Sequence, residues 1–237
     1  MTVSRRNFTK TALAAGGLTL AGPWVRRASA AGDAARLGVL LPLSGPLASL
    51  GNDVRRGFEL ALQLANEDGG LFGQDAELIT VDVPSSTEAT SQATRLITSE
   101  QVGVVMGSYA SSISFAASQV AERNKVVYFE QGAVADDITT RGFKHLFRFI
   151  YPASELGGGA AQFTLDQVLP KINMSASDVR VALLYEDSFY GTAVGEGARK
   201  VLQAANVNII DDTSYSYKTT DLSPMVQRYS QLQPDII

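Results

Sequence analysis

The strongest constraint on the fold is a regular alternation between short apolar runs and longer amphipathic segments. Two of the apolar runs, 102–106 and 179–185, are almost continuous, as expected for strands that are covered on both faces of a sheet. Strands are expected at 37–41, 76–83, 102–106, 126–130, 146–150, 179–185 and 207–210, and another near Asp235. Helices are expected at 52–67, 86–99, 111–123, 155–169, 190–205 and 222–232. Strands that alternate with helices of this length indicate βαβ units and an α/β fold with parallel sheets.

The segment 38–73 is the clearest of these units. Its strand ends at a Pro-Leu-Ser-Gly-Pro elbow, residues 42–46, which can continue neither a strand nor a helix. Asn52 can cap the helix that follows, and Gly69-Gly70 can end it. The apolar residues of that helix recur on one face: Val54, Phe58, Ala61, Leu62 and Ala65. A second capping signal, Ser85-Ser86-Thr87-Glu88, precedes the next helix.

This opening unit resembles that of the type I periplasmic solute-binding proteins, in particular the leucine/isoleucine/valine-binding family of ABC transporters. The resemblance implies two doubly wound, Rossmann-like lobes joined by a hinge, with the elbow at the mouth of a ligand cleft. The rhythm of the sequence breaks at 149–154, so we expect an N-terminal lobe at 31–150 and the start of a second lobe at 151–237. Because the chain stops inside an expected strand, we expect it to be C-terminally truncated, with the second lobe incomplete.

Residues 1–30 are expected to be a twin-arginine signal peptide and not part of the fold. Arg5 and Arg6 lie in a Ser-Arg-Arg-Asn-Phe-Thr-Lys motif, and an apolar run at 11–25 follows them. That run is too short and too rich in small residues to be a permanent membrane anchor. The small residues at 28–30 predict cleavage between Ala30 and Ala31. We therefore expect export by the twin-arginine translocase to the periplasm.

Charge and cysteine content exclude several classes of partner. The leader holds five Lys and Arg residues and no acid, so its removal changes the formal net charge from −4 to −9. An acidic protein of this kind is a poor partner for nucleic acid. The chain has no cysteine, which excludes disulfides, thiolate metal sites and a lipidated cysteine at the cleavage site. The exported protein is expected to be soluble, without a lipid anchor.

The first candidate ligand site follows the strand at 102–106, because ligands of open α/β sheets bind beyond the carboxyl ends of strands. Tyr109, Ser111 and Ser112 lie there, just before a helix. Free N–H groups at a helix start, together with serine hydroxyls, suit a carboxylate. The resemblance implies that Ser111 binds the α-carboxylate of an amino acid, with Ser112 beside it. The alternative is that both serines only cap the helix.

The second candidate site follows the strand at 126–130. The resemblance implies that backbone groups of Gly132 and Ala133 contact the ligand, and it places Val134 where the family has a threonine. Leu50 similarly occupies a position where amino-acid binders often carry an aromatic ring. Both departures weaken the prediction of a standard α-amino acid. Glu130 can supply a negative partner if it faces the cleft.

Alternatively, Glu130 forms an ion pair with Arg123 or Lys125, or lies on the open surface.

In the second lobe, Tyr190 lies at the start of the helix expected at 190–205, and the resemblance implies that it closes over the ligand. A tyrosine combines apolar area with one polar tip, which suits a lid. The alternative is a tyrosine that merely packs at a helix start.

Two other functions compete with solute binding. The first is an enzyme, because twin-arginine export often carries folded redox enzymes. The single histidine, His145, has no clustered acids or cysteines around it in the sequence. No Gly-x-Ser-x-Gly, P-loop or His-Glu-x-x-His motif is present. Gly157-Gly158-Gly159 falls in an expected helix and is no dinucleotide fingerprint. No cofactor or metal is expected. A sensor domain of the same fold is the second alternative, and an attached membrane or signalling segment would favour it.

The sequence thus predicts a non-enzymatic solute-binding component of an ABC importer. Its ligand is expected to be an amino acid, an amide or a related carboxylate, held by hinge closure and delivered to a permease in the inner membrane.

Overall fold

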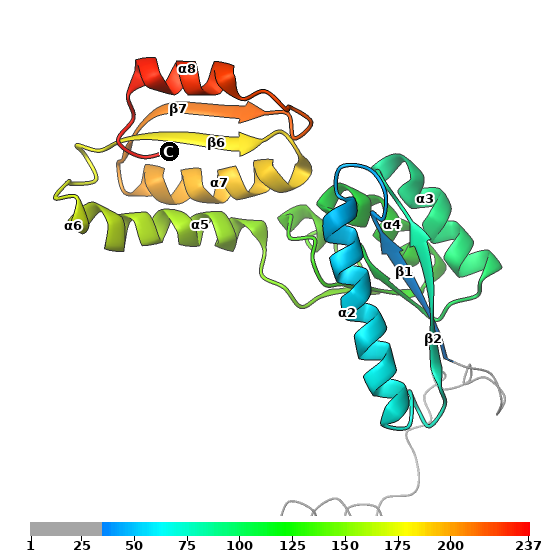
Figure 1. Ribbon diagram of the computed structural model, residues 1–237. Helices are drawn as coiled ribbons and strands as arrows, with labels where there is room; N and C mark the ends of the chain where they lie inside the picture. The colour runs from blue at the N-terminus through cyan, green and yellow to red at the C-terminus, as the bar shows by residue number, and fades with distance from the viewer. Residues whose placement is uncertain (1–34) are drawn as a thin grey trace, which may run out of the picture. The chain divides into compact units, whose positions relative to one another are not determined.

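The expected alternation of strands and helices is present throughout residues 35–237, the part of the chain that the computed structural model describes (Figure 1). Arg5, Arg6 and the expected Ala30–Ala31 cleavage site lie outside these residues, so the signal peptide stays a prediction. None of the described helices combines the length and the hydropathy that a membrane crossing requires.

The first sheet has five parallel strands in the order β2-β1-β3-β4-β5. They are β1 (Ala35–Leu41), β2 (Ala76–Asp82), β3 (Val104–Gly107), β4 (Val127–Glu130) and β5 (Leu146–Arg148). Leu40 of β1 is aligned with Val81 of β2 on one side and with Gly107 of β3 on the other. The strand order reverses between β1 and β3. The carboxyl ends of these two strands therefore form a topological switch point, where ligands of such sheets bind.

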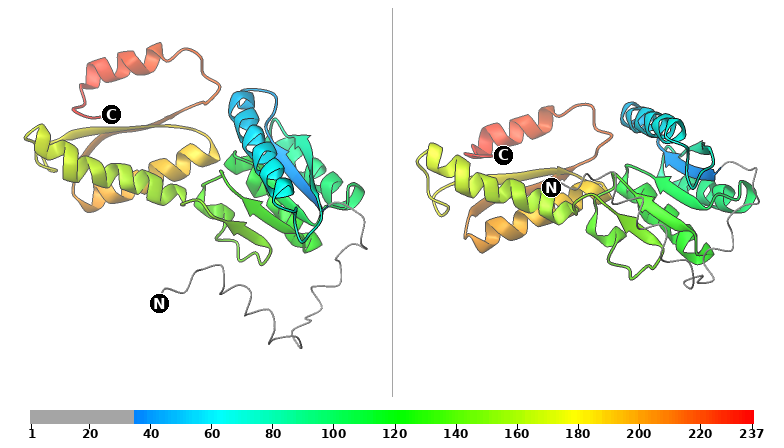
Figure 2. Two further views of the ribbon diagram at one scale, coloured as in Figure 1. Left: turned by 60° about the horizontal axis from the view of Figure 1, so that its bottom comes forward. Right: turned by 90° about the horizontal axis from the view of Figure 1, so that it is seen from below.

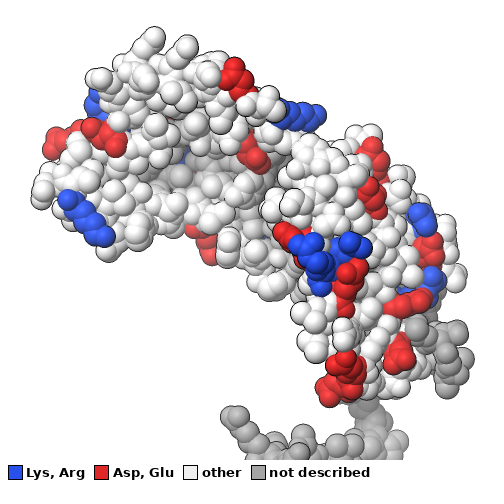
Figure 3. Space-filling view, in the orientation of Figure 1, with Lys and Arg blue, Asp and Glu red and all other residues white. Residues whose placement is uncertain are grey.

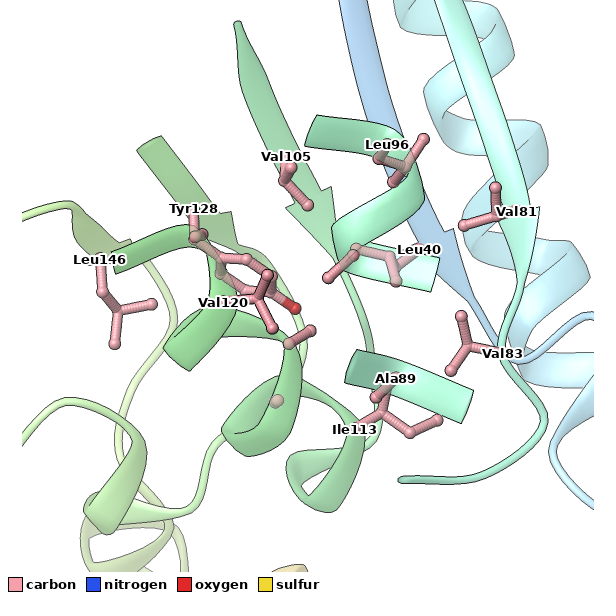
Figure 4. Close-up of a cluster of buried hydrophobic side chains, with 14 of the residues drawn as sticks. Leu40, Val81, Val83, Ala89, Leu96, Val105, Ile113, Val120, Tyr128 and Leu146 are labelled. Carbon is pink, nitrogen blue, oxygen red and sulfur yellow. The ribbon is translucent and has the colours of Figure 1, made fainter. Parts of the chain in front are cut away.

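Helices cover both faces of this sheet, so it is doubly wound (Figures 1 and 2). The helices are α2 (Ala48–Glu67), α3 (Ser86–Thr94) with its π-helical extension η2 (Arg95–Ser99), and α4 (Ser111–Asn124). A short 3-10 helix, η3 (Asp136–Ile138), precedes β5. The face under α3 and α4 is lined by the main core cluster, in which the Tyr128 ring points from β4 into the packing beside Val120 (Figure 4).

A second, two-stranded parallel sheet follows. Its strands are β6 (Arg180–Glu186) and β7 (Asn208–Tyr215), and residues near the expected last strand form a bridge between Val181 and Ile236. The helices of this region are α5 (Ala153–Phe163), η4 (Thr164–Val168), α6 (Leu169–Lys171), α7 (Phe189–Ala204) and α8 (Ser223–Leu232). The first sheet ends at Arg148 and the second begins at Arg180, whereas a lobe boundary at residue 150 stays a prediction.

The expectation that Asn52 caps the first helix is wrong. Helix α2 begins at Ala48, and the Asn52 amide donates instead to the carbonyl of Ala48 at 2.7 Å and of Leu43 at 3.2 Å. The helix begins earlier because Asp82, at the end of β2, accepts the N–H groups of Leu43 and Ser44 and folds the elbow tightly. The predicted apolar face is half-buried, except for Ala61, which is exposed.

The other capping signal is confirmed. The Ser85 hydroxyl accepts the N–H of Thr87 at 3.2 Å and donates to the Glu88 carboxylate. The glycines at 157–159 lie inside α5, as expected from the sequence. A Cβ on Gly157 would lie 1.9 Å from the carbonyl oxygen of Val194, so this glycine allows α5 and α7 to pack in close contact.

Candidate functional site

A cavity of about 580 Å³ lies at the carboxyl ends of the strands. This volume is within the range usual for small-molecule sites. The lining residues come from the loops after β1 to β7, together with the helices that follow them: Leu47, Leu50, Val54, Pro84, Ser85, Ser86, Tyr109, Ala110, Ser111, Ser112, Ile113, Gln131, Gly132, Val134, Ile150, Tyr151, Leu156, Glu186, Ser188, Phe189, Tyr190 and Tyr217. The cavity therefore coincides with the edge that the topology marks for a ligand.

The start of α4 opens into this cavity. Ala110 occupies the N-cap position with extended backbone, and no side chain caps the helix. Ser111 is only 2% exposed, and its hydroxyl oxygen accepts the N–H of Ala135 at 3.3 Å. A hydroxyl also carries one donor, so Ser111 can still donate to a ligand. Ser112 and Tyr109 line the cavity as well, which brings together all three residues predicted on this loop.

The loop after β4 differs from the prediction at Glu130. This side chain is fully buried, and its carboxylate accepts the N–H groups of Ser108, Gly132 and Ala133, each at 2.7 Å, and a bond from the Ser114 hydroxyl. Burial raises the pKa of Glu130 to about 7, although the N–H donors oppose that shift.

Glu130 therefore neither faces the cavity nor pairs with Arg123 or Lys125. A carboxylate that follows a parallel strand is within reach of the N–H groups of two adjacent loops, and these donors satisfy it inside the protein. As a result, the N–H groups of Gly132 and Ala133 are already used, and the expected backbone contact of Ala133 with a ligand has no support, because Ala133 is buried outside the cavity lining.

Gly132, Val134 and Leu50 do line the cavity. The backbone of Gly132 lies close against Tyr109, since a Cβ on this glycine would be 3.1 Å from the Tyr109 Cα. Val134 and Leu50 both present apolar surface, so the two departures from the family pattern make this part of the cavity less polar.

The opposite wall comes from the loop after β6 and the start of α7. Tyr190 lines the cavity and is 40% exposed; burial, followed by the nearby Glu186 carboxylate, raises its pKa above the usual value. Ser188 caps α7, since its hydroxyl accepts the N–H of Gly191 at 3.0 Å and donates to Glu186. Phe189 meets Phe115 of α4 edge to face, with ring centroids 5.1 Å apart.

Sequence reasoning missed several lining residues, although the same rule could have found them. Ser85 and Ser86 follow β2, Tyr151 follows β5 and Tyr217 follows β7, so each lies beyond the carboxyl end of a strand. Gln131 was missed too, and both polar atoms of its amide are buried without a hydrogen-bond partner within the described chain. An unpaired buried amide next to a cavity is costly unless a ligand or water satisfies it.

Among the lining residues, the N–H groups at the start of α4 are the feature that favours an anionic group. Glu186 is the single acid among the lining residues, which all lie in the described part of the chain and include no Lys, Arg or His. On the molecular face in Figure 3, Lys and Arg are interspersed with Asp and Glu and form no broad basic field. A carboxylate would thus depend on the N–H groups and hydroxyls at the start of α4. An apolar body could pack against the surrounding rings.

The described residues contain no group of three or more His, Asp or Glu side chains that could hold a metal ion. His145 lies away from the cavity lining, and its ring is 3.2 Å from the Glu122 carboxylate, which also accepts its backbone N–H.

Comparison with known proteins shows the family to which the chain belongs. Residues 34–237 match the family described as periplasmic binding protein. The "Leu/Ile/Val-binding protein homolog 7" of Brucella abortus (strain 2308) is 36% identical over 202 residues, which make up 85% of this chain and 51% of that protein. The chain thus spans about half the length of the curated relatives it matches.

Two solved structures are similar in fold. One is a solute binding protein of an ABC transporter from R. palustris in complex with benzoate, with a TM-score of 0.75 and 24% identity, covering 86% of this chain and 54% of that one. The other is the branched-chain amino acid transporter substrate binding protein of Streptococcus pneumoniae in complex with isoleucine. It has a TM-score of 0.73 and 24% identity, covering 84% of this chain and 54% of that one.

Proposed function

Because this chain belongs to the periplasmic binding protein family, we propose that it binds a small organic acid in the cavity and presents it to an ABC importer. The observation that carries the proposal is the uncapped start of α4, which opens into a cavity whose lining has no Lys, Arg or His. A carboxylate there is held by N–H groups, the helix dipole and the Ser111 hydroxyl.

The body of the solute packs against the apolar and aromatic lining, chiefly Leu50, Val134 and the rings of Tyr109 and Tyr190. Tyr190, from the opposite wall, moves across the solute as the two lobes close about their hinge. Closure excludes water and strengthens the polar contacts. The closed form is then the one that a permease in the inner membrane recognises. The proposal includes no chemical change of the solute.

The location follows from the same proposal. The twin-arginine signal peptide directs the protein through the twin-arginine translocase to the periplasm, where it acts as a soluble protein without a lipid anchor. Export of fusions in which Arg5 and Arg6 are both replaced by Lys tests this step, since the periplasmic fraction should then lose the protein.

Two solute classes fit the cavity, and Glu186 separates them. An amino acid such as isoleucine or leucine needs an acceptor for its ammonium group, and Glu186 is the acid at the cavity. An aromatic acid such as benzoate needs no such partner. Glu186→Gln should therefore weaken the binding of isoleucine by about tenfold or more, as expected for loss of a charged hydrogen-bond partner. It should change benzoate binding little.

A thermal-shift screen of the protein expressed from its complete gene tests the function as a whole. The panel contains leucine, isoleucine, valine, their amides, benzoate and benzamide. We expect at least one acid to raise the melting temperature, because a ligand that binds only the folded state stabilises it. If no acid does so and a redox cofactor copurifies, the proposed function is wrong.

A further inference from the structure

Glu130 ties together the two loops that form the α4 side of the cavity. It is the last residue of β4, is 0% exposed and does not line the cavity itself. Its carboxylate accepts the N–H of Ser108 from the loop before α4, and the N–H groups of Gly132 and Ala133 from the loop after β4. The residues next to these contacts, Tyr109 after Ser108 and Val134 after Ala133, line the cavity.

The fourth partner of this carboxyl group is a hydroxyl whose hydrogen bond can change direction. Ser114 contacts the Glu130 Oε2 atom, and its Oγ atom is also 3.2 Å from the Tyr128 hydroxyl oxygen. When Glu130 is ionised, Ser114 donates to it. When Glu130 is protonated, its O–H can donate to Ser114, and Ser114 can then donate to Tyr128. The three backbone N–H bonds are retained in both states.

We propose that Glu130 is a positioning residue that exchanges a proton when an organic acid binds: the buried carboxyl group holds the two loops in place and becomes protonated as the solute carboxylate arrives at α4. This inference rests on the proposed function. Ser111 and Ser114 are three residues apart and thus neighbours on α4. A carboxylate at Ser111 and an ionised Glu130 would therefore be two like charges close together in a site largely shielded from water.

The surroundings of Glu130 support a proton that exchanges near neutral pH. Burial raises the pKa of Glu130 to about 7, against the effect of the three N–H donors. The charged and titratable neighbours are few: Arg148 of β5 attracts the ionised form, and Tyr128 shares the Ser114 hydroxyl. Arg141 acts on Tyr128, whose own pKa is raised by burial. From α4 the neighbour is the neutral Ser114.

The sign of the effect follows from these states. A bound anion favours the neutral form of Glu130, so binding takes up a proton and the affinity for an acid rises as the pH falls through 7. At an effective dielectric constant of about 20, repulsion between two such charges is expected to change the affinity by about tenfold or more. The carboxyl groups of benzoate and isoleucine stay ionised throughout the range of pH 6 to 8.5, so the solute itself contributes no such change.

Isothermal titration calorimetry in buffers of different ionisation enthalpy measures this proton directly. With isoleucine or benzoate as the probe, the wild-type protein should take up a fraction of a proton near pH 7.5, and its affinity should fall about tenfold between pH 6 and 8.5. Glu130→Gln should show neither effect. Glu122→Gln is the matched control, because Glu122 also accepts backbone N–H bonds but lies outside the cavity lining. It should keep both effects.

Carbon-13 NMR of the carboxyl groups gives a test that needs no ligand. The signal absent from Glu130→Gln should titrate near pH 7 in the free protein, and Ser114→Ala should move that midpoint up, because the hydrogen bond from the Ser114 hydroxyl lowers the pKa of Glu130. If Glu130→Gln does not fold, Ser114→Ala alone provides the comparison. A midpoint in the ordinary carboxyl range, or binding without proton uptake in the wild type, overturns the inference. If an acid binds without proton uptake, the inference fails and the proposed function stands; if no acid binds, the proposed function fails and the inference fails with it.

Discussion

Helices α4 and α7 both begin at the cavity after a buried strand, yet their first turns are built differently. Helix α7 is capped by its own Ser188, which accepts the N–H of Gly191. Helix α4 has no side-chain cap, and Ser111 lies inside its first turn with its hydroxyl at the cavity. A free set of N–H donors is unfavourable unless something else satisfies it. The difference supports the proposal that α4 receives a ligand group, whereas α7 supplies a wall.

The strand-end glutamates differ in the same way. Glu130 is buried and accepts backbone N–H groups of the two loops beside α4 and the Ser114 hydroxyl, whereas Glu186 lines the cavity and accepts a hydrogen bond from the capping Ser188. One acid thus holds together the wall that is proposed to receive the carboxylate, and the other lies where a positive group of the solute could reach it. Three substitutions and one change of pH test this difference between the two walls.

The largest effect is expected from Ser111→Asp. The new carboxylate would occupy the position proposed for the solute carboxylate and would repel it, at a cost of about 3 kcal/mol or more. Calorimetry with the best-binding acid should show an affinity at least about 100-fold lower. Because Ser111 is only 2% exposed, the new carboxylate should also lower the melting temperature of the free protein, so the affinity is measured well below that temperature. Unchanged affinity would place the anion site elsewhere.

The next effect concerns stability and pH. Since burial raises the pKa of Glu130 to about 7, whereas the unfolded chain titrates near the ordinary value of 4.5, the folded state holds more protons between these two values. The free energy of unfolding should therefore fall as the pH rises from 4.5 to 7, by on the order of 2 kcal/mol, and then level off. Urea unfolding at pH 5, 6, 7 and 8 measures this, and Glu130→Gln should lose that component of the slope. An identical profile in both proteins would contradict the assignment.

Ser111→Ala is the more conservative test of the α4 wall. It removes one hydrogen bond to a charged group, which corresponds to about 10–100-fold in affinity. Ser112→Ala is the matched control on the adjacent, exposed residue, and it should lower the affinity by no more than about threefold, because its backbone N–H is retained. If both variants bind alike, Ser111 has no special role.

The smallest effect on binding is expected from Ser188→Ala. Loss of this cap should lower the free energy of unfolding by about 1 kcal/mol, as measured by urea denaturation. Affinity for the acid should change by less than about threefold, since no N–H at the start of α7 is proposed to hold the carboxylate. A larger loss of affinity than of stability would mean that the α7 wall also binds the charged group.

Much of the fold was predictable because it rests on local patterns. Apolar runs such as 179–185 fixed the positions of the strands, and the resemblance seen in the elbow at 42–46 is confirmed by the family match over 34–237. The failure at Asn52 has a tertiary cause: Asp82, far away in the sequence, folds the elbow and lets the helix begin at Ala48.

The site was less predictable, for a related reason. Strand ends correctly located Ser111, Val134 and Tyr190 at one cavity. No local pattern could show that Glu130 turns inward, because its partners Ser108 and Ser114 come from another loop and helix. Tyr217 and Ser85 were missed because the strand-end rule was applied to only three of the seven strands.

A calorimetric comparison of an acid with its neutral amide in the wild-type protein tests whether a carboxylate binds at the start of α4. Benzoate with benzamide, and isoleucine with isoleucinamide, differ only at the group that is proposed to contact the start of α4. In the pair whose acid binds, the acid should bind at least about tenfold more tightly than the amide. Equal affinity of the acid and its amide would contradict the claim that α4 receives a carboxylate.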